Sequence, residues 1–287
     1  MKNFRLPLIL ILFLFVLSAC QKDNLQVDDP VSVEAEKEIL DASLELTDEV
    51  MNTLKSSYFN TGDVSIIDFH LPDGTIQKRY QLEGDIALSS EQMQQFIKLK
   101  DLDSKNYHTN NLVRPRTLSI IGYTGNGFAL SNKERTALQW AVNNYNRLNL
   151  GIRFNLTFGT NFDDKDMVVY NNERNNPNRS GGVAGFPSNG NPNKFIQIYG
   201  LGGFSTNVNE HVITHEIGHS VGFRHTDWFS RQSCGENTNE GVGSIGANPI
   251  PGTPEGYDAT SLMLACFSST VDGEFNRNDV TALNFLY

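Results

Sequence analysis

Three histidines and one glutamate stand at spacings that could hold a metal ion. Side chains four residues apart on a helix point the same way, so His215 and His219 can bind one ion from a single face. Glycine can adopt the left-handed conformation that ends a helix, and Gly222 would let the chain turn back to present His225. Three protein ligands leave the fourth position on zinc to water, with Glu216 beside it. The spacing predicts one catalytic zinc ion.

The order His-Glu-x-x-His-x-x-Gly-x-x-His resembles the hallmark of the metzincin clan of zinc endopeptidases, in which a methionine turn follows downstream. Here Met263 follows His225 by 38 residues. Within the clan, His-Glu-Ile-Gly-His continued by Gly-Phe-Arg-His-Thr-Asp-Trp is similar to the dual-action HEIGH metallopeptidase family. The likeness covers about residues 117 to 287 and includes the stretches 181–187, 233–235 and 252–254.

This resemblance implies a zinc metalloendopeptidase in which Glu216 is the general base toward the zinc-bound water and Met263 supports the ion from below without ligating it. The substrate would be an extended polypeptide that adds to a sheet edge at residues 181–187. Astacins place a tyrosine ligand two residues after the methionine; Ala265 stands there, so no tyrosine switch is expected. Loop carbonyls and carboxylates could hold a calcium ion, but the sequence offers no support for one.

Two other interpretations share the same ligands. A zinc hydrolase could act on a bond other than a peptide, and only substrate tests separate it from a peptidase. A non-catalytic surface adhesin could use the fold as a zinc-containing binding module, although such a module has little use for Glu216.

The expected fold class is α+β. Residues 111–287 would form a metzincin-like catalytic domain with a twisted mixed sheet, a long N-terminal helix, an active-site helix, a methionine turn and a C-terminal helix. Ser131 and Glu134 form a capping box for the long helix, and Asn207 is expected to cap the active-site helix. His211 is expected on the helix surface, and Trp140 in the core. Strands are predicted at 117–122, 152–158, 166–170 and 194–199, and a closing helix at 278–287 with Phe285 in the core.

Residues 33–110 are expected to be a small α+β prosegment, with a helix at 34–54, a hairpin turning at Asp73-Gly74 and a short helix after Ser89. Residues 80–88 are similar to the Phe-x-Gly-Asp-Ile segment of the astacin prosegment, whose aspartate occupies the zinc site. A carboxylate is a competent zinc ligand. Our hypothesis is that Asp85 is the latency switch of a zymogen; the alternative is a strand-to-turn aspartate with no metal role. The polar linker ending at Arg116 would be a natural nicking site.

The N-terminus predicts export. Lys2 and Arg5 precede an apolar run that is too short to span a membrane. Leu17-Ser18-Ala19-Cys20 resembles a bacterial lipobox, which implies a signal peptide at 1–19, lipid on Cys20 and a flexible tether at 20–32. The protein would then be anchored in the outer membrane and face either the periplasm or the exterior. An ordinary signal peptide that ends near a cysteine is the alternative.

Two cysteines remain after lipidation of Cys20. In an exported protein, Cys234 and Cys266 are expected to form a disulfide that pins the Met263 turn to the segment after His225. A free, buried pair is the alternative. Asp227 could orient a metal-bound imidazole from behind, or it could be a plain turn residue.

The charge is acidic and uneven. The full chain has a net charge of −10; residues 21–110 hold 8 basic and 18 acidic residues, whereas 111–287 hold 13 and 15. This asymmetry supports two domains, and neither is basic enough to favour a nucleic-acid partner. We expect a monomer.

Overall fold

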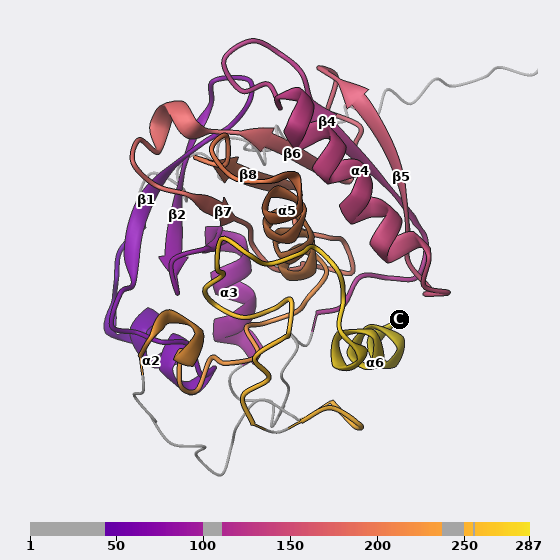
Figure 1. Ribbon diagram of the computed structural model, residues 1–287. Helices are drawn as coiled ribbons and strands as arrows, with labels where there is room; N and C mark the ends of the chain where they lie inside the picture. Colours follow the sequence, from indigo (N-terminus) through magenta and orange to yellow (C-terminus); the bar gives the residue numbers. More distant parts are fainter. Residues whose placement is uncertain (1–43, 100–110, 237–249, 255) are drawn as a thin grey trace, which may run out of the picture.

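The computed structural model describes residues 44–99, 111–236, 250–254 and 256–287, and its architecture is α+β as expected. We call residues 44–99 the N-terminal part and the remainder the C-terminal part. The expected signal peptide, tether and Cys20 lie outside the described residues. Each part has its own sheet, one of three strands and one of five, and Figure 1 shows the N-terminal part lying at one end of the larger sheet.

The N-terminal part contains a hairpin flanked by two helices. Strand β1 (Ser65–His70) pairs antiparallel with β2 (Ile76–Leu82), which pairs antiparallel with β3 (Ile86–Leu88). The predicted turn is confirmed: Gly74 has φ 91° and the Asp73 carboxylate accepts a hydrogen bond from the amide of Thr75. Helices α2 (Asp48–Ser56) and α3 (Ser90–Leu99) complete this part.

The sequence predicts a helix at 34–54, of which residues 34–43 lie outside the described residues. The prediction is wrong for residues 44–47, which are not helical. Thr47 is extended, and its hydroxyl accepts a hydrogen bond from the amide of Val50, so it caps a helix that begins at Asp48.

The larger sheet is mixed. Strands β4 (Thr117–Tyr123), β5 (Arg153–Gly159), β6 (Met167–Asn171) and β8 (Phe195–Tyr199) are parallel, and β7 (Gly181–Val183) pairs antiparallel with β8. The order is β5-β4-β6-β8-β7, so β7 is an edge strand. The four strands predicted by alternation are therefore present, and residues 181–183 lie at a sheet edge.

The predicted capping box is present: α4 (Asn132–Asn146) begins after Ser131, whose side chain and that of Glu134 bond each other's backbone amides. Figure 1 shows α4 beside α5 (Thr206–Ser220) on one face of the larger sheet. The Tyr145 hydroxyl donates to the carbonyl of Thr214, which joins the two helices inside the main core. Trp140 is 39% exposed, so its predicted place in the core is wrong; it lies on the other side of α4 from Tyr145.

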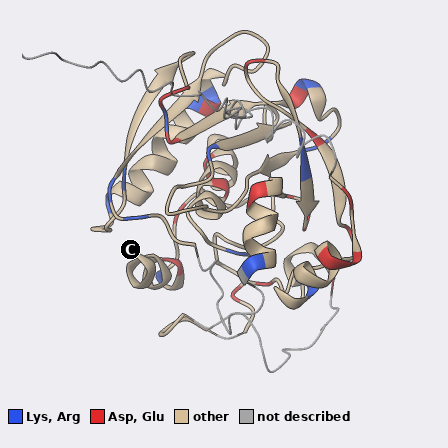
Figure 2. Ribbon diagram, turned by 180° about the vertical axis from the view of Figure 1, so that it is seen from behind, with Lys and Arg blue, Asp and Glu red and all other residues tan. Residues whose placement is uncertain are grey.

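The remaining helices are α6 (Arg277–Leu286) and two 3-10 turns, η1 (Glu173–Asn175) and η2 (Gln232–Cys234). Phe285 was expected in the core, but it is 53% exposed because α6 turns Ala282 and Leu283 inward instead. Within the described ranges, no helix is long and apolar enough to cross a membrane. Figure 2 shows basic and acidic residues dispersed over many elements rather than gathered on one.

Candidate metal centre

Helix α5 and the turn that follows it carry the three histidines. The cap of α5 is Ser205, whose hydroxyl accepts a hydrogen bond from the amide of Val208, so the expectation of Asn207 is wrong; Asn207 already lies in the first turn. After α5 ends, Gly222 has φ 114°, which is strained for other residues. This turn brings His225 back toward His219, as the motif predicts.

The three imidazoles face one another. Nε2 of His219 lies 3.2 Å from Nε2 of His225, and His215 contacts both rings edge-on or tilted. Each Nδ1 atom lies 2.8–2.9 Å from an oxygen: the carbonyl of Leu262 for His215, the carbonyl of Phe223 for His219, and the Glu83 carboxylate for His225.

With each Nδ1 hydrogen-bonded to an oxygen, the Nε2 atoms can bind a cation. Oxygen accepts the proton of each Nδ1, so each neutral ring directs the lone pair of its Nε2 inward. Among the described residues, none makes a hydrogen bond to the buried Nε2 of His215. Three converging lone pairs repel one another unless a positive charge lies between them, so these residues fit a metal ion.

Asp85 completes the cluster. Its Oδ2 lies 2.9 Å from Nε2 of His225, 3.5 Å from Nε2 of His215 and 4.0 Å from Nε2 of His219. One ligand atom from each of the four residues falls within 4.8 Å of the others, the arrangement expected around one ion. Burial alone would lower the pKa of His225, but the carboxylates of Asp85 and Glu83 raise it to about 10. The carboxylates thus favour a positive charge at this place.

The backbone beside Asp85 lies along the sheet edge. The amide of Ala184 donates to the carbonyl of Asp85 at 2.9 Å, and the amide of Ala87 donates to the carbonyl of Ala184 at 2.7 Å. The resulting bridge between Ile86 and Ala184 is parallel. Residues 85–87 therefore lie beside Ala184, the residue that follows β7, while Asp85 points at the histidines.

Glu216 is buried between α5 and β7. A Cβ atom on Gly182 would lie 2.5 Å from Cγ of Glu216, so only glycine at position 182 lets the glutamate approach the edge strand. Burial and the nearby charge of Asp85 raise the pKa of Glu216 well above its usual range. Its Oε2 is buried and accepts no hydrogen bond from any residue that the structure describes.

Met263 lies beneath α5. A Cβ atom on Gly218 would come within 2.6 Å of the Met263 sulfur, which explains glycine between the two helical histidines. The carbonyl of Met263 accepts a hydrogen bond from the amide of Thr226, next to His225. Met263 thus supports the helix and the turn that carry the three rings.

A family model described as dual-action HEIGH metallo-peptidase matches residues 80–287. The chain belongs to this family. The match begins before the catalytic-domain likeness seen in the sequence, and it includes the segment that carries Asp85.

Two solved structures of myroilysin are similar in part. One is 12% identical with a TM-score of 0.39, covering 62% of this chain and 82% of that one. The other, a crystal structure, is also 12% identical, with a TM-score of 0.40, covering 62% and 86%. No curated protein matches the chain.

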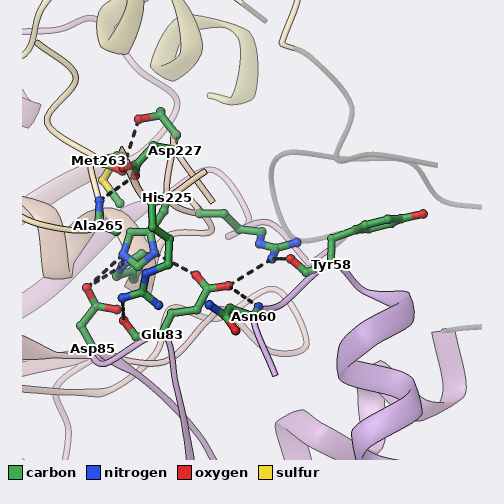
Figure 3. Close-up of polar contacts among 12 residues, drawn as sticks. Tyr58, Asn60, Glu83, Asp85, His225, Asp227, Met263 and Ala265 are labelled. Atoms are coloured by element: carbon green, nitrogen blue, oxygen red, sulfur yellow. Dashed lines mark hydrogen bonds and ion pairs between the residues drawn. The ribbon is translucent and has the colours of Figure 1, made fainter. Parts of the chain in front are cut away.

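The disulfide expected in this HEIGH metallopeptidase is present between Cys234 and Cys266. For Asp227 the sequence left open a place behind an imidazole or a plain turn role; its carboxylate accepts hydrogen bonds from the backbone and hydroxyl of Ser233 and from the amide of Ala265. None of these partners is an imidazole, and each Nδ1 of the cluster lies beside another oxygen. Asp227 and the disulfide together hold the segment after His225 against the Met263 turn. Figure 3 shows Asp227 beside Ala265.

His211 was expected on the helix surface, and this is wrong: it is 6% exposed, with its Nδ1 2.9 Å from the carbonyl of Asp272. Burial lowers its pKa to about 4. It lies outside the metal cluster, where its ring stacks on that of His215.

Glu83, the partner of His225, is a residue that the sequence does not single out. Glu83 stands only two residues before Asp85, and that nearness was the one available signal. Its contact joins residues 142 positions apart, so no local pattern reveals it.

Proposed function

We propose that this metallopeptidase is a zinc endopeptidase whose metal is held by His215, His219 and His225. The observation that supports it is the inward orientation of three Nε2 atoms whose Nδ1 atoms are all bound to oxygen. Three imidazole ligands with one open position are typical of catalytic zinc. When bound, zinc would acidify a water molecule and polarise the scissile carbonyl.

Residues of the chain would transfer the proton and bind the substrate. The carboxylate of Glu216 would take a proton from the attacking water and later give it to the amine that leaves. Strand β7 ends the strand order of the larger sheet, and an extended polypeptide could add beside it as a further strand. Since Glu216 packs directly against Gly182, a peptide on that edge would place its carbonyl beside the general base.

We propose that the N-terminal part keeps this enzyme latent. Asp85 lies where water would otherwise meet the metal, and residues 85–87 lie on the edge that a substrate would use. Cleavage in the linker that ends at Arg116 would release the block. In this proposal residues 33–110 are a prosegment and 111–287 the catalytic domain.

The lipobox-like sequence supports a location. We propose that the precursor loses residues 1–19, carries lipid on Cys20 and remains anchored as a monomer in the outer membrane, where its substrates are polypeptides. Labelling of cells with a radioactive fatty acid would test this, since Cys20→Ser should abolish the label.

The function is tested by metal analysis and casein cleavage on residues 21–287, before and after cutting near Arg116. We expect one zinc per chain and activity that appears or rises on cutting. One zinc with no cleavage in either form would favour a different zinc hydrolase or a binding protein. Absence of zinc would contradict the ligand assignment.

A further inference from the structure

A second carboxylate of the N-terminal part reaches the metal centre. The side chain of Glu83 is 2% exposed; one oxygen lies 2.9 Å from Nδ1 of His225, and the other accepts a hydrogen bond from the amide of Asn60 at 3.1 Å. Figure 3 shows Glu83 between His225 and Asn60. The guanidinium of Arg224 lies 3.9 Å from the second oxygen. A buried carboxylate thus has a cationic partner and a metal-ligand histidine as neighbours.

Arg224 is buried, yet its contacts are mostly with the N-terminal part. It donates hydrogen bonds to the carbonyls of Ser57 at 2.7 Å and Tyr58 at 2.6 Å, where α2 ends. Its guanidinium also lies 4.0 Å from the centre of the Phe59 ring. Departure of the N-terminal part would remove these partners and leave the positive charge beside His225.

The position of Glu83 is costly for the chain. Its φ is 52°, a left-handed conformation that residues with a Cβ adopt rarely. Burial of a carboxylate is also unfavourable unless a partner compensates it. A residue that only filled the turn would be glycine or asparagine. Glu83 is therefore better explained as a group bound by a specific site.

The backbone next to Glu83 is bound by two further arginines. Arg231 donates to the carbonyl of Glu83 at 3.4 Å, and Arg179 donates to the carbonyl of Gly84 at 3.3 Å. Both line a cavity of about 410 Å³ that also contacts His215 and Glu216. These two arginines thus bind the backbone of the segment that carries Glu83, while Arg231 also faces the carboxylates of Asp63 and Glu236.

We propose that Arg224 and Nδ1 of His225 form a carboxylate-binding subsite beside the metal, filled by Glu83 in this chain. Once the N-terminal part leaves, the same subsite binds an acidic side chain of the peptide substrate. This inference rests on the proposed peptidase function and specifies its substrate class: extended peptides that carry aspartate or glutamate near the scissile bond. It also means that latency depends on two carboxylates, with Glu83 bound behind His225 and Asp85 in front.

The first test measures retention of the N-terminal fragment. Residues 21–287, loaded with zinc, are cut at a protease site inserted between 100 and 110, and the bound fragment is quantified by native mass spectrometry. Glu83→Gln should raise its dissociation constant about 30-fold or more, because Arg224 and His225 lose a buried charged partner. The control is Glu91→Gln, whose carboxylate contacts Asn189 across the same interface at the exposed rim. It should change the constant by less than about twofold.

A double-mutant cycle of Glu83→Gln and Arg224→Gln separates their interaction from any folding defect of the single variants. If Glu83 and Arg224 share one subsite, Glu83→Gln should weaken retention much less when Arg224→Gln is already present. Equal retention of the wild-type and Glu83→Gln fragments, or additive effects of the two substitutions, would overturn the subsite.

The second test examines the substrate. The cut protein is given a peptide library, and its cleavage sites should be enriched about tenfold in acidic over amide residues at one fixed position. Arg224→Gln should abolish that enrichment, measured as the ratio of acidic to amide residues at that position among the sites that are cut. Cleavage without acidic preference would overturn the substrate class. No cleavage of any peptide would overturn the peptidase function, and the retention measurement would still decide whether the subsite exists.

Discussion

A substitution at Gly218 tests how the Met263 side chain packs against α5 at the metal centre. In Gly218→Ala, the new Cβ would lie 2.6 Å from the Met263 sulfur, 3.2 Å from its terminal carbon and 3.4 Å from the Tyr145 hydroxyl. Contacts below 3.0 Å force the neighbour to move. Overpacking of this kind costs about 1–3 kcal/mol, while alanine in place of a helical glycine returns about 0.5–1 kcal/mol.

The steric cost should therefore exceed the helix-propensity gain. The flexibility of methionine moderates the cost, so we expect a net destabilisation of about 1–2 kcal/mol. For a chain of this size that corresponds to a fall in Tm of roughly 2–8 °C. Because Met263 must move away from α5, zinc affinity should also fall.

Differential scanning calorimetry and a competitive zinc chelator would measure the two effects. The matched control is Gly202→Ala, where an added Cβ meets nothing within 4 Å and φ is not left-handed; its Tm should stay within about 1–2 °C of wild type. A Gly218→Ala variant that is as stable as wild type and binds zinc equally well would refute the packing argument.

Three further predictions concern protonation and latency. Glu216→Gln should retain zinc, measured by atomic absorption, and lose casein cleavage by about 100-fold or more, since the proton acceptor is gone; appreciable residual activity would contradict its role. Asp85→Asn in the uncut chain should raise peptidase activity, whereas the exposed Asp68→Asn should not; an uncut Asp85→Asn variant as inactive as wild type would exclude the switch. Burial raises the pKa of Glu210 from 4.5 to about 7, so the folded state keeps a proton that the unfolded state has lost, and stability should fall as pH rises through this interval. Glu210→Gln should flatten that decline in urea unfolding, and an unchanged pH dependence would contradict the assignment.

Features that depend on residues close together along the chain can be predicted from the sequence alone. His215 and His219 share a face because a helix repeats every 3.6 residues, and Gly222 returns His225 because glycine tolerates φ 114°. The capping box of Ser131 and Glu134 and the hairpin turn at Gly74 follow from equally local chemistry. These effects act within a few residues, so spacing alone predicts them.

Local patterns gave wrong predictions in two situations. In one, two nearby residues could both cap a helix; in the other, a distant segment set the exposure of a side chain. Ser205 caps α5 instead of Asn207 because the chain is still extended at Ser205. His211 reads as a surface residue on α5, but the loop at Asp272 covers it. Burial depends on which distant segment packs against a helix face, which the helix's own sequence does not encode.

The carboxylates that complete the metal centre can be identified only in the tertiary structure. Glu83 and Asp85 meet His225 across 142 and 140 positions of the chain, and Asp227 binds the loop of Ser233 and Ala265 rather than an imidazole. Such contacts exist because the N-terminal and C-terminal parts pack together and bury charge between them. Their energy comes from desolvated partners brought together in space, and that information is absent from any short stretch of sequence.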